Sequence, residues 1–506
     1  MIQTLLVAAR DRSRLKEIVQ IASRFGLDVL LARLGLDSTQ GHSPGETSGQ
    51  NLPQRTRQAL EALGPTFMKL GQILATRGDL LPPEWIAELE QLHSQAPVLP
   101  FETLRPALEE ALGEPPESIF ASFDTVPLAA ASMAQVHRAT LSDGRPVVLK
   151  IRRPGIRPLM EADLRLIAQV AEIVEAASAE ARRFAPAAMM RQLTEAVLEE
   201  LDFTTEGRNA DRLSADFARN SRVVIPEIHW LWTSESVLVM DYIDGMPPSN
   251  ATALRSAGID PAIIASLGAD IMLDMVLING RFHGDPHPGN LLCLPGNRMA
   301  LLDLGMIGHV SPRRREEFIT FVQSFNTGDP RQLADVLSIW SADSRVKQGT
   351  FHSVAERLIA KHSGGHLVLK ALVGDFMAVM RDEGLVMPPD LLLIFKALVT
   401  VDGVLSSIVP DFNLSGAMQR STLRIASSRL SIEHWGPIVQ GVAWELSKFG
   451  DDMPRLLRAA MRRLEADPAT LPPSRDHSAA IASAGRWIAG AIVASGALIS
   501  AAMAFT

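Results

Sequence analysis

Apolar residues recur at helical spacing over most of the chain, and a shorter block in between has the pattern of strands. Residues 1–36 are predicted to form one or two amphipathic helices, either docked on the protein's own domain or lying on a membrane surface. A polar linker rich in Gly, Ser and Thr follows over residues 37–52. Helical spacing then recurs over residues 53–93, 101–112, 159–215, 258–280 and 311 to about 465.

Three short strands are predicted before the helical residues 159–215, and two more are predicted after them. The second and third strands are joined by the turn Ser142-Asp143-Gly144-Arg145, which fits a hairpin. The predicted strands are Val126–Ala131, Ala134–Ala139, Val147–Ile151, Val223–Ile228 and Ser236–Asp241.

The order of these elements predicts an α+β chain in which a helical extension precedes a lobe of strands and a helical lobe. After the first helical segment over 1–36 and the linker over 37–52, we expect the extension over 53–118. The lobe of strands, with inserted helices, covers 119–245, and the helical lobe covers 246–470. A transmembrane helix is expected over 487–505.

The expected transmembrane helix, Trp487–Phe505, carries no charge and would span roughly 28 Å, about one hydrocarbon core. A buried core helix is the alternative, because Ala and Gly are only weakly apolar. Arg475 and Arg486 lie on its upstream side, which predicts that the body of the protein faces the cytoplasm. Small residues four apart would let the helix pack against a partner helix, so a homodimer stays open.

Composition excludes several classes of function. The chain has 506 residues, enough for two or more domains, and 47% of them are hydrophobic, so most of it should fold. A net charge of −8 argues against nucleic acid as a general partner. Cys293 is the only cysteine, which excludes an intrachain disulfide and a cysteine-based zinc site.

The candidate chemistry is concentrated in residues 281–305, RFHGDPHPGNLLCLPGNRMALLDLG. Asp285 is followed by Asn290 and then by Asp303, which lies in Asp-Leu-Gly after an apolar run. Such oxygen ligands, together with substrate phosphates, suit Mg²⁺. The order His-x-Asp-x-x-x-x-Asn and then Asp-x-Gly is the arrangement of protein kinases. Two turns containing Asp on either side of a hairpin are the alternative interpretation.

Upstream residues fall into the order that a kinase would need. Lys150 ends an apolar strand, in the position of the kinase lysine that contacts the nucleotide phosphates. Glu200, near the end of a predicted helix, is a candidate partner for that lysine. A lysine closing an edge strand and a glutamate on a solvated helix face are the alternatives. The loop Ala129–Gln135 lies where a kinase has its glycine-rich loop but has no glycine, so its β-carbons limit how closely it approaches phosphate.

A further lysine lies in the helical extension. Lys69 and Gln72 are three residues apart on one face of a helix that starts at Gly64-Pro65. Gly71 lies inside this helix at a cost of about 1 kcal/mol relative to Ala, so we expect close packing there. From the spacing alone, a solvated lysine is the favoured interpretation of Lys69.

The motifs over about residues 53–310 resemble those of the UbiB/aarF-type atypical kinases, a family linked to ubiquinone biosynthesis in bacteria and mitochondria. The matching stretches occur in one order: LGPTFMKLGQILATRGDLLP, AAASMAQVHRA, VVLKIRRPG, ELDFTTEGRNA, LVMDYIDG, FHGDPHPGNLL and LLDLGMIG. The resemblance implies a two-lobed protein-kinase-like fold that binds ATP or ADP with Mg²⁺. Family members commonly carry C-terminal membrane helices, and bacterial relatives often show two. This sequence has one visible span, Trp487–Phe505, so we expect an inner-membrane protein with a single-pass C-terminal anchor.

The resemblance also implies a role for each site residue. Lys150 would contact phosphates and pair with Glu200. Asn290 and Asp303 would hold magnesium. Asp285 would be the catalytic aspartate, and Lys69 would enter the site from the extension. The residues implied at the nucleotide are Ala130, Ala131, Ser132, Met133, Ala134, Lys150, Glu200, Met240 and Tyr242. Those implied in support are Gln72, Asp202, Glu206 and His283.

Three residues depart from the pattern of the family. Leu304 replaces the usual phenylalanine of the metal motif, and Gly207 and Gly284 stand where alanine is usual. The departures retain every polar group of the motifs, so they leave the implied chemistry intact.

The function implied is that of a membrane-associated ATPase or kinase-like regulator of ubiquinone synthesis. It would act on or beside prenylated quinone precursors and the enzymes that modify them, with membrane lipids as further partners. A kinase with an unidentified small-molecule or protein acceptor is one alternative, and a nucleotide-gated scaffold of a lipid-biosynthesis complex is another. A hydroxylase role finds no support, because the sequence has no flavin fingerprint and no haem-attachment motif.

Overall fold

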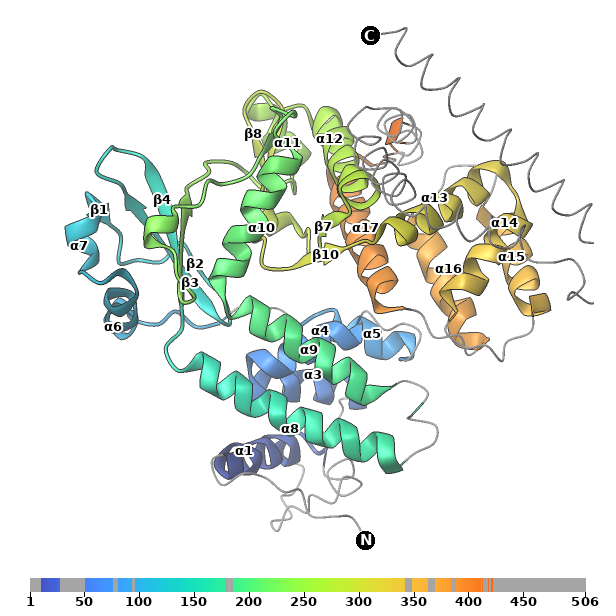
Figure 1. Ribbon diagram of the computed structural model, residues 1–506, viewed down its shortest axis with the longest axis horizontal. Helices are drawn as coiled ribbons and strands as arrows, with labels where there is room; N and C mark the ends of the chain where they lie inside the picture. The colour runs from blue at the N-terminus through green and yellow to red at the C-terminus, as the bar shows by residue number, and fades with distance from the viewer. Residues whose placement is uncertain are drawn as a thin grey trace, which may run out of the picture. The chain divides into compact units, whose positions relative to one another are not determined.

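The computed structural model describes residues 11–27, 51–75, 81–92, 96–177, 182, 185–341, 348–362, 369–383, 388–410, 412, 417 and 420–421. Within these ranges the chain has a mixed fold of helices and small sheets (Figure 1). Most of the predicted linker over 37–52 and all of the predicted membrane helix Trp487–Phe505 lie outside the described residues.

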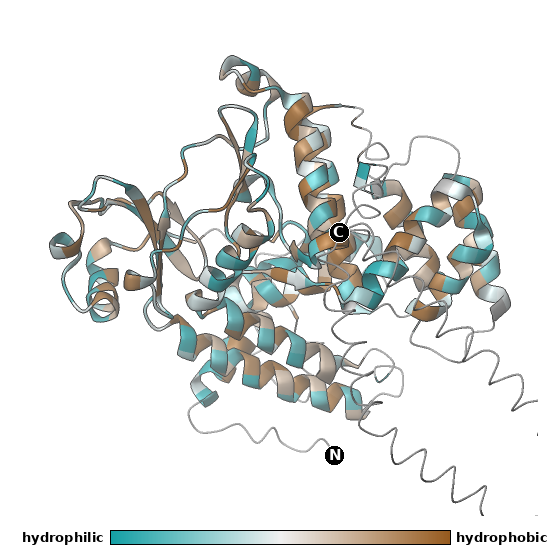
Figure 2. Cartoon of the chain, turned by 45° about the horizontal axis from the view of Figure 1, so that its top comes forward, coloured by the Kyte–Doolittle hydropathy of each residue, from teal (hydrophilic) through white to brown (hydrophobic). Residues whose placement is uncertain are grey.

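The N-terminal segment and the first part of the extension form one group of short helices, which packs on two longer helices. Its helices are α1 (Arg12–Arg24), α3 (Leu52–Leu63), α4 (Pro65–Ala75) and α5 (Pro83–Leu89), and they lie beside α8 (Ile156–Ala177) and α9 (Pro186–Glu200) (Figure 1). Both α8 and α9 carry apolar residues on one side and polar residues on the other (Figure 2). Their apolar sides form one buried cluster, which includes Met160, Leu193 and Val197.

The close packing expected at Gly71 is confirmed. A β-carbon at this position would lie 2.3 Å from Leu92 Cδ1 and 2.9 Å from Leu60 Cδ1. Helix α4 starts where α3 ends, because Gly64 has a φ of 104°, which L side chains rarely adopt, and Pro65 suits the first turn of a helix.

The main sheet is antiparallel, in the order β1-β3-β4-β6, and β2 also pairs with β3. The predicted strands Ala134–Ala139 and Val147–Ile151 are confirmed to within one residue at each end. The expected strand Val126–Ala131 is wrong except for Ala129 and Ala130, because Pro127 has no N–H for a ladder. The strands are β1 (Ser122–Phe123), β2 (Ala129–Ala130), β3 (Ala134–Thr140), β4 (Pro146–Arg152) and β6 (Val237–Asp241).

The two faces of β4 pack against different helices. Val147, Leu149 and Ile151 are buried in a cluster with Leu104 and Leu108 of α6 (Phe101–Leu112). Because successive side chains of a strand point to opposite faces, Lys150 points away from α6. The face of Lys150 is covered by α10 (Phe203–Asp216), and Lys150 Nζ lies 5.3 Å from the ring centroid of Phe203.

The helical lobe contains two small sheets. In one, β7 (Arg281–His283) pairs with β10 (Ile307–His309). In the other, the hairpin of β8 (Leu291–Leu294) and β9 (Arg298–Leu301) is joined by β5 (Val223–Val224), which pairs in parallel with β9. The predicted strand Val223–Ile228 is therefore only two residues long. The described helices of this lobe are α11 (Ala251–Ser256), α12 (Pro261–Asp274), α13 (Pro312–Thr327), α14 (Pro330–Trp340), α15 (Gln348–His362), α16 (Leu369–Asp382) and α17 (Pro389–Ile408).

Two helical stretches among the described residues are long and apolar enough to span a membrane, Pro261–Asn279 and Asp390–Ile408. Their most apolar windows are 67% and 56% buried, and both stretches belong to the main hydrophobic core of the lobe. This burial is typical of core helices. The π-helical turn Met275–Asn279 extends α12 up to β7 and leads directly into the candidate catalytic loop.

Candidate functional site

Lys150 lies between two carboxylates. Its Nζ is 2.8 Å from Glu206 Oε2 and 3.1 Å from Asp303 Oδ1. Burial alone would lower the pKa of Lys150, but Asp303 and Glu206 outweigh it and raise this pKa above its usual value. The lysine therefore stays charged and joins the sheet to the loop that carries Asp303.

The expected pair of Lys150 and Glu200 is wrong, because the partner of Lys150 is Glu206. Glu206 is in the first turn of α10, on the buried side that carries Phe203 and Ala210, and this side covers the Lys150 face of β4. Burial raises the pKa of Glu206, and Lys150 offsets this only in part. Its other oxygen, Oε1, is buried and has no hydrogen-bond partner among the described residues.

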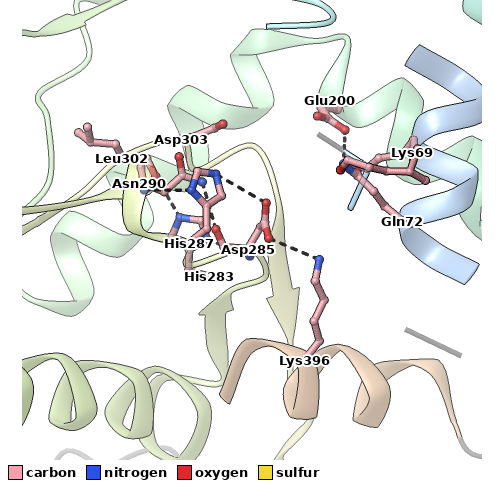
Figure 3. Close-up of polar contacts among 12 residues, drawn as sticks. Lys69, Gln72, Glu200, His283, Asp285, His287, Asn290, Leu302, Asp303 and Lys396 are labelled. Carbon is pink, nitrogen blue, oxygen red and sulfur yellow. Dashed lines mark hydrogen bonds and ion pairs between the residues drawn. The ribbon is translucent and has the colours of Figure 1, made fainter. Parts of the chain in front are cut away.

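Glu200 pairs instead with the lysine of the extension. Lys69 Nζ of α4 lies 2.6 Å from Glu200 Oε2 at the end of α9 (Figure 3). Lys69 is also close enough to Asp303 to help lower its pKa. The solvated lysine favoured from spacing alone is thus wrong, and the implied entry of Lys69 toward the site agrees with the structure. Gln72 lies beside Lys69, and its Nε2 donates to Leu92 O at 3.2 Å.

Asp202 and His283, both implied as supporting residues, hold local structure. Asp202 caps the N-terminus of α10, where its Oδ1 accepts from Thr204 N at 2.9 Å. His283 is buried, and burial lowers its pKa, which favours the neutral ring. Its Nδ1 accepts from Asp285 N at 3.1 Å, so Nε2 is the donor to Leu302 O at 2.9 Å. The ring therefore ties the loop of Asp285 to the strand end that precedes Asp303.

The loop that follows β7 carries Asp285 and Asn290. Asn290 is buried in the 3-10 turn Pro288–Asn290, and its Nδ2 donates to Asp285 O at 3.0 Å. This leaves the side-chain oxygen of Asn290 for a cation. The Asp285 carboxylate is half-exposed, and its Oδ1 is 3.4 Å from Lys396 Nζ of α17 (Figure 3).

Asp303 has a backbone conformation that few residues other than glycine adopt. Its φ of 52° is in the left-handed region, which Asp tolerates better than most residues. The charge of Lys150 is the main cause that lowers the pKa of the half-exposed Asp303 carboxyl group to about 2. The side chain is therefore an ionised carboxylate at neutral pH. A small pocket beside it is lined by Glu206, Met240 and Leu304 as well as by Asp303 itself.

The alanine-rich loop is a tight turn, closed by a hydrogen bond of 2.8 Å from Ala131 N to Ala134 O around Ser132 and Met133. Ala130 ends β2 and Ala134 starts β3. Arg153 holds the loop, since its Nε donates to Ala131 O at 2.9 Å and its backbone N to Met133 O at 2.8 Å. The Met133 side chain packs against the cluster of α8 and α9. The Met133 side chain therefore contributes to the helix packing.

The predicted hinge residues follow β6. Tyr242 N donates to Pro146 O at 3.0 Å, so this amide is occupied within the sheet. The guanidinium of Arg138 lies 4.2 Å from the centroid of the Tyr242 ring. Met240 lines the small pocket beside Asp303, and the contact of Tyr242 with a nucleotide stays a prediction.

The two glycines that depart from the family pattern each face a large neighbour. A β-carbon on Gly207 would lie 2.9 Å from Trp230 Cη2, and one on Gly284 would lie 2.8 Å from Met306 Cγ. Leu304 is buried in the core, and its carbonyl accepts from Asn209 Nδ2 at 3.0 Å. The departures are therefore part of the local packing.

The donor set fits a magnesium ion held jointly with a nucleotide. Within the described residues, no group of three or more His, Cys, Asp or Glu could hold a metal ion by itself. Asn290 and Asp303 together offer one amide oxygen and one carboxylate. Mg²⁺ is usually bound in this way, through one or two carboxylates while phosphates and waters complete the octahedron.

Sequence reasoning missed one residue of the site and misassigned the role of another. Glu206 was placed only in a supporting role, although its spacing from Phe203 and Ala210 on one helix face could have indicated that it faces the sheet. Lys396 was not considered. The sequence indicates this residue only weakly. Lys396 is the only basic residue in the apolar helix Pro389–Ile408, and it is 111 positions beyond Asp285.

Comparisons with known proteins agree with this fold. The ABC1 atypical kinase-like domain matches residues 91–337, and the UbiB helical domain matches residues 354–413. A "Probable protein kinase UbiB" of Marinobacter nauticus is 34% identical over 378 residues, which cover 72% of this chain and 68% of the relative. A protein of the same name from Aeromonas salmonicida is 32% identical over 430 residues, 80% of this chain and 77% of the relative.

A solved structure, that of the Rv3197–erythromycin complex from Mycobacterium tuberculosis, has a similar fold. It aligns with a TM-score of 0.50 at 23% identity and covers 71% of this chain and 92% of the solved chain. The fold and the site thus define an atypical kinase-like protein. The chain belongs to the UbiB family of ABC1 atypical kinases.

Proposed function

We propose that this protein is a membrane-associated, kinase-like ATPase that binds Mg²⁺ and ATP or ADP and supports ubiquinone biosynthesis. It would act on or beside prenylated lipid intermediates or the enzymes that modify them. The observation that carries the proposal is the position of Lys150 between Glu206 and Asp303, 2.8 and 3.1 Å away. A charged lysine held by two elements is suited to orient nucleotide phosphates.

The residues around Lys150 have complementary tasks in this proposal. Asp303 and Asn290 would hold a magnesium ion, which, when bound, neutralises charge on the phosphates. The half-exposed Asp285 would accept the proton of the attacking water or hydroxyl group. His283 keeps the loops of Asp285 and Asp303 in register through its two ring nitrogens.

Separate observations support the remaining parts of the proposal. Ubiquinone biosynthesis is suggested by the family resemblance and by the relatives named UbiB. Membrane attachment, to the inner membrane with the body in the cytoplasm, is suggested by the uncharged segment Trp487–Phe505. The ion pair of Lys69 and Glu200 sets the extension beside the site, which favours release of phosphate to water over transfer to a protein.

The proposal is tested by phosphate release from ATP, measured with and without Mg²⁺ and with and without anionic liposomes. We expect Mg²⁺-dependent release that liposomes stimulate, and no stimulation for a chain that ends at Ala484. Asp303→Asn should abolish release. Asp335→Asn, the same change on an exposed position of α14, should leave release unchanged. Phosphate transfer to an acceptor without release would favour a kinase, and tight nucleotide binding without turnover would favour a scaffold.

A further inference from the structure

Lys396 brings a positive charge to the catalytic loop from a distant part of the chain. Its Nζ lies 3.4 Å from Asp285 Oδ1, and in Figure 3 its side chain points from α17 toward that carboxylate. The kinase-like domain match ends at residue 337, whereas Lys396 lies in the helical domain matched over 354–413. The helical domain thus contributes a side chain to the site.

The position of Lys396 is set by a rigid helix. Its neighbours Phe395 and Ala397 are buried, and the Phe395 ring packs against Phe376 at a centroid distance of 5.5 Å. More aromatic rings surround Phe395, namely Phe318, Phe321 and Trp340. A charged side chain on such a packed element is placed more accurately than one on a loop.

The other lysines of the site have shorter contacts elsewhere. Lys150 pairs with Glu206 at 2.8 Å, and Lys69 pairs with Glu200 at 2.6 Å. His287 Nε2 lies 4.0 Å from Asp285 Oδ2, and its Nδ1 already accepts from Gly289 N. Among the described residues, Lys396 is therefore the nearest cation to Asp285. The contact is long and both side chains are partly exposed, so the ammonium can leave Asp285 for a nearby anion.

We propose that Lys396 is a catalytic residue that binds the terminal phosphate of ATP. This inference rests on the proposed function and adds a residue to that site. In the reaction, the bond from the terminal phosphorus to the oxygen that bridges it to ADP breaks, and a bond to the water oxygen forms. The water proton passes to Asp285, and ADP leaves with the electron pair of the broken bond. Lys396 stabilises the negative charge on the oxygens of the phosphoryl group during the transfer.

This role predicts that Lys396 contributes to the affinity for ATP but not to that for ADP, because only ATP has the phosphate that Lys396 contacts. We expect Lys396→Met to weaken ATP binding about tenfold or more, while ADP affinity stays within about twofold of wild type. Phosphate release should fall about 100-fold, as expected for the loss of one charged group at the transition state. Lys396→Arg, which keeps the charge, should retain a preference for ATP.

The matched control is Lys361→Met on α15, which removes the same charge from an exposed ion pair with Asp375 in the same helical domain. All variants are made in the full chain, and their thermal unfolding is measured alongside binding with Mg²⁺ present. The control should bind both nucleotides and release phosphate as wild type does. If Lys396→Met does not fold, Lys396→Gln supplies the same comparison.

Two outcomes would overturn the role of Lys396. One is an equal loss of ATP and ADP affinity, which would make Lys396 a structural partner of Asp285. The other is an unchanged ratio of ATP to ADP affinity together with unchanged phosphate release. A wild-type protein that binds neither nucleotide would instead refute the proposed function, and the role of Lys396 with it. The ratio of affinities remains informative for a wild type that binds nucleotides without hydrolysing ATP.

Discussion

Lys69 of the extension and Glu200 of α9 form an ion pair of 2.6 Å, so Glu200 is not the partner of the strand lysine Lys150. Six residues later, Glu206 takes that place at 2.8 Å from Lys150. Asp202 lies between the two glutamates and caps α10. One short stretch therefore connects the sheet lysine, the start of a helix and the helical extension.

Because the two glutamates have different partners, substitutions at Glu206 and Glu200 should have different effects on ADP affinity. Glu206→Gln removes the buried charge that fixes Lys150, so ADP affinity should fall about tenfold or more. Glu200→Gln leaves the pair of Lys150 and Glu206 intact and should keep ADP affinity within about threefold of wild type. Titration of both variants with ADP and Mg²⁺ checks this, and an equal loss in both would refute the assignment.

A buried ion pair fixes α1 to the helices around the site. Arg14 Nε lies 2.6 Å from Asp163 Oδ1, and the fully buried Asp163 also accepts from Thr66 on α4. Arg14→Met would leave a buried carboxylate without its cation, so the free energy of unfolding should fall by about 3–5 kcal/mol. Arg145→Met breaks a half-exposed pair with Asp143 and should cost less than about 1 kcal/mol. Urea denaturation of both variants measures this difference.

The cost of Arg14→Met should depend on pH. Burial raises the pKa of Asp163 even with Arg14 in place, and removal of Arg14 would raise it further. A carboxyl group whose pKa is raised in the folded state destabilises the fold when it is ionised. This cost disappears below the unfolded-state pKa of about 3.9, where the group is protonated in both states. The difference in unfolding free energy between wild type and Arg14→Met should thus shrink as the pH falls from 7 toward 4. A difference that grows over this range would contradict the explanation.

Substitution of two helical glycines by alanine should change the stability of the protein in opposite directions. At Gly71 a β-carbon would meet Leu92 and Leu60, so Gly71→Ala should destabilise the protein by about 1–3 kcal/mol. At Gly374, inside α16, no atom of the described part of the chain lies within 4 Å of such a β-carbon. Gly374→Ala should therefore stabilise the protein by about 0.5–1 kcal/mol, as the helix propensities predict. Thermal unfolding of both variants is the measurement, and a stabilising Gly71→Ala would refute the close packing.

Arg153 should control the order of the alanine-rich loop. Its side chain donates to Ala131 O at 2.9 Å and to Pro97 O at 2.7 Å. Arg153→Met should increase hydrogen exchange in residues 129–135 and weaken nucleotide binding by about tenfold. The control is Arg157→Met, which breaks an ion pair with Glu235 in a part-exposed position. Unchanged exchange in Arg153→Met would show that the turn keeps its shape without the arginine.

Much of the fold follows from local pattern. The helix Phe101–Leu112 has its predicted bounds, because Pro100 and Gly113 enclose one amphipathic segment. The spacing of Asp285, Asn290 and Asp303 identified both loops, since the hairpin between them is short. The strand expected over Val126–Ala131 is mostly loop because of Pro127, whose effect on the ladder outweighed the apolar pattern.

Pairings between distant segments could not be predicted in the same way. Both Glu200 and Glu206 are acidic residues near a helix end, and the choice between them depends on which face of α10 covers β4. The contact of Lys396 with Asp285 depends on how α17 packs against the remainder of its lobe, and a single sequence contains no signal of that packing. Local rules therefore located the motifs, and tertiary packing decided their partners.

The most direct test of the account is the effect of Mg²⁺ on the affinity for ATP at equilibrium. Mg²⁺ should tighten ATP binding by wild type about tenfold or more, because Asp303 and Asn290 would share the ion with the phosphates. Asp303→Asn should lose this effect, and Asp335→Asn should keep it. ATP affinity that is independent of Mg²⁺ in wild type, or an Asp303→Asn variant that responds like wild type, would contradict the account.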